Sequence, residues 1–86
     1  MKKYKILKGF IFEKMDGGKM IIFDQEKSKM LTFNQTASFI FERLKRGYDE
    51  KSITGALLKK YKVGEKQARR DVKEIISKLK KRKIIV

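Results

Sequence analysis

The first third of the chain predicts an antiparallel hairpin. Two runs rich in Ile, Phe and Met flank an Asp-Gly-Gly segment at residues 16–18, which is a strong signal for a turn between paired strands. If the first two residues of that segment form a two-residue loop, Phe12 lies opposite Ile21 and Phe10 lies opposite Phe23. All four side chains then share one face, as a sheet covered on one side requires.

A third strand is predicted at residues 30–33, after a turn at residues 26–29. If the strands follow one another as a meander, this strand lies at an edge of the sheet. An edge strand presents unpaired N–H and C=O groups, with which another extended chain can pair. The alternative is an ordinary edge strand that is protected by its shortness and by Lys27 and Lys29.

The rest of the chain shows helical periodicity in three segments. Asn34 is a candidate N-cap for the first segment, Gly47 is a natural stop, and Asp49 is the next candidate N-cap. The third segment spans residues 65–83 and follows a turn that contains Gly64. The apolar stripes are Ala37, Ile40, Phe41 and Leu44 in the first segment, Ile53, Leu57, Leu58 and Tyr61 in the second, and Ala68, Val72, Ile75, Ile76 and Leu79 in the third.

The order β-β-β-α-α-α predicts a single α+β domain over residues 1–86. Residues 84–86 (Ile-Ile-Val) either end the last helix or form a terminal strand. The last two helices are joined by a Gly-containing turn, as in a helix-turn-helix, and the hairpin suggests a wing. The expected fold is therefore winged helix-turn-helix-like, with a three-stranded antiparallel sheet followed by three helices.

Amino-acid composition excludes several classes of function but few classes of fold. The 86 residues include 24 Lys plus Arg against 10 Asp plus Glu, which gives a net charge of +14, and they include neither Cys nor His. Thiol nucleophiles, disulfides and the commonest general base and metal ligand are therefore missing. We expect a protein that is not an enzyme and uses no cofactor or metal. Because no apolar stretch resembles a signal peptide or a membrane span, we expect a cytoplasmic protein without membrane contact.

The positive charge permits nucleic acid as a partner. In the third helix, Arg69 and Arg70 could contact bases and Lys73 a phosphate. Two features weigh against DNA: the chain ends almost directly after this helix, where a wing usually follows, and acidic residues such as Asp71 and Glu74 interrupt the basic face. The basic run at residues 78–83 is equally typical of a solvated helix end, where cations are favourable.

A groove between the third strand and the third helix is the competing site. Its floor would be apolar and its rim basic, which suits a peptide with apolar anchors and acidic residues between them. Such a peptide would add to the edge strand through main-chain hydrogen bonds, and side-chain pockets would supply specificity.

The chain resembles the PqqD-like family over about residues 6–86. The most specific element is the Asn-x-Thr-Ala entry to the first helix at residues 34–37, which follows Phe33. The resemblance continues through Gly47, the Asp-Val pair at residues 71–72 and the closing Ile-Ile pair at residues 84–85. Two positions depart from the family pattern: Arg46 stands where an Asp usually precedes the glycine, and Lys83 stands where a Gly usually precedes the last apolar pair.

The resemblance implies a precursor-peptide recognition element of ribosomally synthesised, modified peptides (RiPPs). Such a domain binds the leader segment of a precursor peptide as a strand added to the third strand, packed against the third helix. The partners implied are the leader peptide and a modifying enzyme, such as a leader peptidase or a radical SAM enzyme. A stand-alone domain of the lasso-peptide type is one form that fits. Carried onto this sequence, the binding residues are Met30, Leu31, Thr32, Phe33, Ala68, Arg69, Asp71, Val72 and Ile75.

Overall fold

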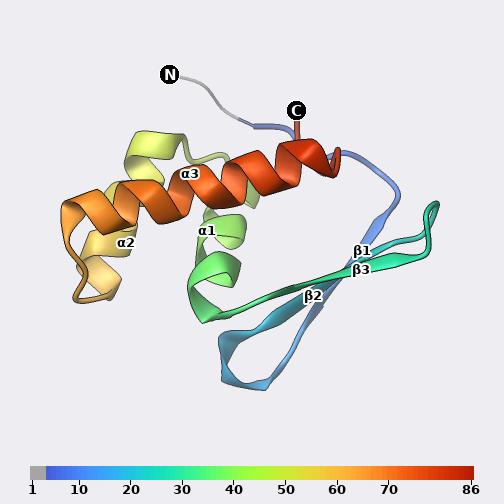
Figure 1. The fold of residues 1–86 in the computed structure, drawn as a ribbon, viewed down its shortest axis with the longest axis horizontal. Coiled ribbons are helices and arrows are strands. Elements are labelled where there is room, and N and C mark those ends of the chain that lie inside the picture. Colours follow the sequence, from blue (N-terminus) through green and yellow to red (C-terminus); the bar gives the residue numbers. More distant parts are fainter. Residues whose placement is uncertain (1–3) are drawn as a thin grey trace.

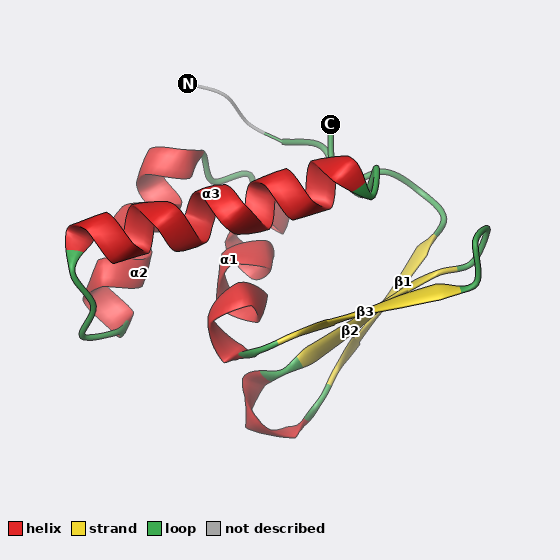
Figure 2. Ribbon diagram, viewed as in Figure 1, coloured by secondary structure: helices red, strands yellow, loops and turns green. Residues whose placement is uncertain are grey.

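The computed structural model describes residues 4–86, so the expected start of the domain at residues 1–3 lies outside the described residues. The elements are β1 (Phe10–Lys14), the 3₁₀ turn η1 (Asp16–Gly18), β2 (Met20–Asp24), β3 (Lys29–Phe33), α1 (Gln35–Lys45), α2 (Glu50–Lys60) and α3 (Glu65–Lys81) (Figures 1 and 2). The predicted α+β class is confirmed: a three-stranded antiparallel sheet precedes three helices. The likeness to a winged helix-turn-helix stays a prediction.

The hairpin register differs from the predicted one by one residue. Phe12 lies opposite Ile22 rather than Ile21, because the strands are joined by five residues instead of two. The backbone N–H of Met15 closes this loop by donating to the Lys19 carbonyl at 2.8 Å. Ile22 therefore faces the helices with 1% of its surface exposed, and Ile21 lies on the outer face of the sheet. The alternation could not fix this register, because β2 is apolar on both faces.

Capping residues begin and end the helices where the sequence predicted. The Asn34 Oδ1 accepts a hydrogen bond of 2.9 Å from the N–H of Ala37, and the Asp49 Oδ1 accepts one of 2.8 Å from Ser52. Both bonds satisfy N–H groups that a helix start leaves without a partner. Gly47 follows α1 with a φ of 86°, as the predicted stop requires.

The last helix ends at Lys81, two residues before its predicted end. The backbone N–H of Ile84 donates to the Leu79 carbonyl at 2.9 Å, and that of Lys83 donates to Lys80 at 3.0 Å, which is the pattern of a Schellman motif. The chain then turns back, so that Ile85 pairs with Ile6 in an antiparallel bridge. Of the two alternatives for residues 84–86, the structure therefore favours the terminal strand.

The core lies between the inner face of the sheet and the helices. Figure 1 shows α3 crossing the molecule, with α1 between it and the sheet and α2 beside the start of α3. Phe41 of α1 packs against both outer strands of the sheet: its ring centroid lies 5.0 Å from that of Phe12 in β1 and 6.1 Å from that of Phe33 in β3. This packing holds the inner face of the sheet against α1. None of the helices within residues 4–86 is long and apolar enough to cross a membrane.

Candidate functional site

The free edge of β3 is the first feature of the candidate site. The sheet order β1-β2-β3 places β3 at an edge, as the predicted meander required. Two backbone hydrogen bonds at the ends of the β1–β2 pair show which residues of β2 point toward β1: Gln25 donates to the Gly9 carbonyl at 3.1 Å and Met15 donates to the Lys19 carbonyl at 2.8 Å. Because backbone groups alternate sides along a strand, the residues of β2 that point toward β1 are Ile21 and Phe23.

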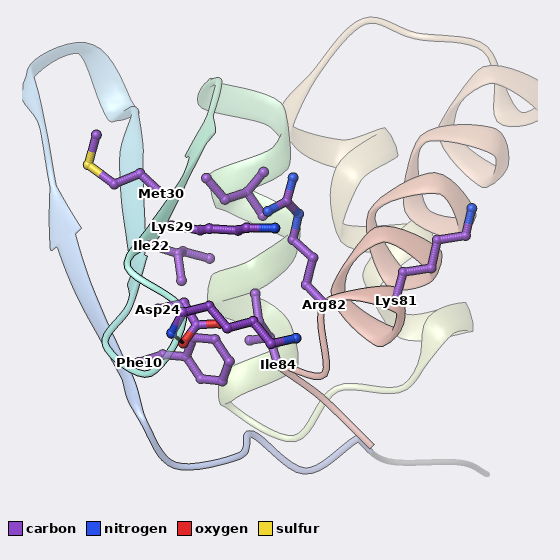
Figure 3. A pocket seen from close by; sticks show the side chains of 10 residues that line it. Phe10, Ile22, Asp24, Lys29, Met30, Lys81, Arg82 and Ile84 are labelled. Atoms are coloured by element: carbon purple, nitrogen blue, oxygen red, sulfur yellow. Dashed lines mark hydrogen bonds between the residues drawn. The ribbon is translucent and has the colours of Figure 1, made fainter.

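The same alternation determines which groups of β3 are free. The residues of β2 that point toward β3 pair with Lys29, Leu31 and Phe33. Met30 and Thr32 therefore direct their backbone N–H and C=O groups to the open edge. Their side chains lie on the outer face of the sheet, and that of Met30 is 63% exposed. Figure 3 shows the Met30 side chain pointing away from α3.

A basic hollow lies beside the start of β3. It has a volume of about 320 Å³, and its floor is apolar, formed by Phe10, Ile22, Leu31 and Ile84. Its charged rim comprises Asp24, Lys27, Lys29, Lys81 and Arg82. In Figure 3 the Arg82 side chain extends from the end of α3 toward β3, whereas Lys81 points away. Four cations against one carboxylate make this hollow attractive to acidic groups.

A second hollow lies beside the end of β3 and has a volume of about 300 Å³. Thr32 and Phe33 line it from the strand, and Asp71 and Ile75 line it from α3. The remaining lining residues are Asn34, Thr36, Ala37, Ile40, Glu74 and Lys78. We call the two hollows together the β3–α3 groove. Its charge changes along its length, from basic beside the start of β3 to mixed beside its end.

The structure brings together six of the nine predicted binding residues. Met30 and Leu31 line the basic hollow, while Thr32, Phe33, Asp71 and Ile75 line the second one.

The other three predicted residues lie elsewhere. Ala68 and Val72 have no exposed surface and belong to the core, so they support the groove from behind. Arg69 faces α2: its guanidinium lies 3.3 Å from the Glu65 carboxylate, and it lines a hollow that includes Thr54. The position of Arg69 therefore does not support its prediction as a leader-binding residue.

Sequence reasoning predicted a basic rim for the groove but did not identify the residues that form it. Lys29, Lys78 and Arg82 line it, together with Asn34 and Glu74. For Lys78 the signal was present in the helical spacing, because Asp71, Ile75 and Lys78 recur every three or four positions along one face of α3. The predicted set included Asp71 and Ile75 of this row, but it took Ala68 and Val72 from the neighbouring, core-facing stripe and left out Lys78. Within residues 4–86, no three His, Cys, Asp or Glu side chains form a cluster that could hold a metal ion.

Comparisons with known proteins give the family and the fold of this chain. The family model described as coenzyme PQQ synthesis protein D (PqqD) matches residues 19–85. The fold is similar to the solved structure of a lasso peptide synthetase B1 complexed with the leader peptide, with a TM-score of 0.88, 22% identity and 99% of each chain covered. It is also similar to TbiB1 in complex with the TbiA(beta) leader peptide, with a TM-score of 0.84, 17% identity and coverage of 94% of this chain and 93% of that one. The search of curated proteins gives no match.

Proposed function

This chain belongs to the PqqD family, and from that premise we propose that it binds the leader segment of a ribosomally synthesised precursor peptide. The leader adds to β3 as a fourth strand and lies along the β3–α3 groove. The observation on which the proposal rests is the free edge of β3, where Met30 and Thr32 direct their backbone groups outward beside that groove. Both structural neighbours were solved in complex with a leader peptide, which supports a leader as the ligand.

The groove indicates which leader chemistry fits. A strand added to β3 places every second side chain on the inner face, next to Leu31 and Phe33. One inward side chain can enter the hollow lined by Ile75, where an apolar anchor buries its surface. A neighbouring inward residue reaches the basic hollow, where Lys29 and Arg82 favour a carboxylate. We therefore propose a leader with apolar anchors and at least one acidic residue.

The role that follows is that of an adaptor. We propose that the protein presents the bound leader to a maturation enzyme, such as a leader peptidase or a radical SAM enzyme, and does not itself catalyse a reaction. Precursor peptides are made by ribosomes in the cytoplasm, so the proposal places the protein there. The DNA-binding alternative has no support from the comparisons, since both structural neighbours are leader-peptide complexes.

Fluorescence anisotropy tests the proposal with two labelled probes, a synthetic leader from the precursor encoded beside this gene and a DNA duplex of similar length. We expect the leader to bind, with a mild loss of affinity between about 50 mM and about 200 mM salt, because main-chain pairing dominates. DNA binding that depends on several phosphate contacts would weaken by orders of magnitude over that range. Tight duplex binding without a response to the leader would contradict the proposal.

A proline scan of the leader supplies the control. Proline has no N–H, so at leader positions that donate to β3 it should abolish binding. At the intervening positions, whose N–H groups point away from β3, the loss should be much smaller. A uniform response along the leader would argue against strand addition.

A further inference from the structure

Another concave surface, separate from the β3–α3 groove, lies on the opposite side of α1. It has a volume of about 320 Å³ and lies between the β1–β2 loop, α1 and the end of α2. We call it the α1 hollow, and its central residues are Met15, Ser38, Phe39, Glu42, Arg43 and Tyr61. The α1 residues that line the groove, Thr36, Ala37 and Ile40, lie on a different face of the same helix. The two concave surfaces can therefore be occupied at the same time.

The α1 hollow gathers polar atoms that have no hydrogen-bond partner. In the described part of the chain, the buried side-chain atoms without a partner are Ser38 Oγ, Glu42 Oε1, Arg43 Nε and Tyr61 Oη, and all four residues line this hollow. Ser38 is only 5% exposed. Burial of a polar group without a partner is costly, so most buried polar groups in proteins are paired. Glu42 Oε1 has the Lys14 ammonium beside it, so three donors remain, on Ser38, Arg43 and Tyr61, and three unpaired donors around one hollow point to a ligand that accepts hydrogen bonds.

The chemistry of these atoms defines that ligand. The Ser38 hydroxyl, the Arg43 Nε–H and the Tyr61 hydroxyl can each donate a hydrogen bond. The surrounding cations are Lys14, Lys19, Arg46 and Lys60, in addition to Arg43. The single acidic residue among the lining residues, Glu42, already lies 3.8 Å from the Lys14 ammonium. A group that accepts several hydrogen bonds and is negatively charged fits this arrangement, and a carboxylate is such a group.

The apolar part of the hollow indicates a protein as the source of the carboxylate. The Phe39 and Tyr61 rings pack edge to face at 5.8 Å, and the Arg43 guanidinium lies 4.5 Å from the Phe39 ring centre. Met15 stands at the rim with 44% of its surface exposed. Tyr, Phe, Met and Arg are the residue types enriched at the centres of protein interfaces. An apolar side chain next to the carboxylate would cover Met15 and Phe39.

We propose that the α1 hollow is a docking site for a partner protein, which inserts an acidic side chain flanked by an apolar residue. The donor atoms of Ser38, Arg43 and Tyr61 are buried in the free protein, so these side chains turn toward the carboxylate on docking and then donate hydrogen bonds to it. The assignment of the maturation enzyme as this partner rests on the proposed function, whereas recognition of the carboxylate does not. An adaptor that holds a leader on one side of α1 and an enzyme on the other would bring the two together.

Nuclear magnetic resonance of the ¹⁵N-labelled protein tests the site with acetyl-Leu-Asp-Leu-amide, acetyl-Leu-Asn-Leu-amide and sodium acetate as probes. We expect the Asp peptide to shift the Arg43 Nε–H signal and the amide signals of Ser38 and Tyr61 in a saturable manner. The Asn peptide and acetate should each bind at least about tenfold more weakly, a difference of about 1.4 kcal/mol. The docking site is refuted if the Asp peptide gives no saturable shift at these residues, or if either control probe binds equally well.

Two variants sharpen the test. Arg43→Lys keeps the charge but removes the Nε–H, and Ser38→Ala removes one donor, so both should reduce the response to the Asp peptide by about tenfold or more. Arg70→Lys is the matched control, because Arg70 is exposed and lies outside both concave surfaces. Leader affinity, measured on the same variants, should not change. An unchanged Asp-peptide response in Arg43→Lys would overturn the docking site, whereas failure of the wild-type protein to bind leader would overturn only the proposed function.

Discussion

The Asn34 side chain accepts a hydrogen bond of 2.9 Å from the backbone N–H of Ala37, directly after β3 ends. This bond caps the start of α1, which follows the edge strand after a single residue. Asn34 and Ala37 also line the end of the β3–α3 groove. The most specific part of the family resemblance, the Asn-x-Thr-Ala entry, therefore has a structural role beside the candidate binding site.

Asn34→Ala should lower the free energy of unfolding by about 1 kcal/mol, because one N–H at the start of α1 loses its partner. Asn34→Asp is the matched control, since an aspartate can accept the same hydrogen bond and is favourable at a helix N-terminus. Urea denaturation followed by circular dichroism measures both variants. Equal destabilisation by the two substitutions would show that the cap is not the source of the effect.

The sequence predicted the helices well because their signals are local. Caps at Asn34 and Asp49 and the stop at Gly47 need only a few neighbouring residues, and each is confirmed. The hairpin register was predicted wrongly because it depends on tertiary packing. Residues 20–23 are apolar on both faces, so only the packing of Met20 and Ile22 against the helices selects the inner face.

The candidate site was predicted only in part, because some of its residues also depend on tertiary packing. The edge strand follows from element order, and residues such as Asp71 and Ile75 follow from the family resemblance. The position of Arg82 depends on how the end of α3 lies against the sheet, which no local pattern contains. Arg69 was also assigned to the groove from the family resemblance, yet it lies on the α2 side.

Met30→Pro should weaken leader binding by about tenfold or more, because it removes a backbone donor from the open edge of β3. The loss of about one hydrogen bond corresponds to an effect of this size. Stability should change little, since the Met30 N–H does not pair with β2. Leu31→Pro is the contrasting variant: its N–H points toward Ile22, so it should unfold the sheet. Denaturation and leader anisotropy, measured on both variants, test which N–H groups of β3 point to the open edge. Unfolding by Met30→Pro together with a stable Leu31→Pro variant would disprove the assignment.

Truncation of two neighbouring residues, by Ile75→Ala and by Ile76→Ala, should distinguish a residue of the groove from a residue of the core. Ile75 is half-buried and lines the groove, so its truncation should reduce leader affinity with a modest loss of stability. Ile76 is only 5% exposed and faces the core. Its truncation should cost about 2–5 kcal/mol of stability and leave the affinity of the folded fraction unchanged. Calorimetric titration with the leader, at a temperature where both variants are folded, distinguishes the two effects.

Asp49 should make the protein less stable in acid. The Ser52 backbone N–H, and secondarily its side chain, hold the pKa of the Asp49 carboxyl below its usual value. A pKa that is lower in the folded state means that the charged form adds stability above the unfolded-state value of about 3.9, and that this stability is lost as pH falls through the folded-state value. Asp49→Asn should show a smaller loss of stability over that range. Identical pH profiles would exclude Asp49 as the source.

Lys83→Gly should stabilise the protein by about 1 kcal/mol. The chain leaves α3 through Lys83 with a φ of 57°, a left-handed conformation that costs about 1–2 kcal/mol for a residue with a Cβ atom. The same Schellman motif ends α1, where Tyr48 donates to the Arg43 carbonyl at 3.1 Å and Gly47 occupies the equivalent position with a φ of 86°. Lys83, which stands where the family usually has Gly, therefore adopts a backbone conformation that lowers stability.

Gly47→Ala is the reciprocal variant for this prediction. A Cβ atom at Gly47 meets nothing within 4 Å, so the expected loss of about 1 kcal/mol comes from the backbone alone. Thermal unfolding of Lys83→Gly, Gly47→Ala and the double variant measures both effects. The two effects should add, because no capping hydrogen bond joins the end of α1 to the end of α3. If Lys83→Gly lowers the melting temperature, the Lys83 side chain stabilises the end of α3 by more than its backbone conformation costs.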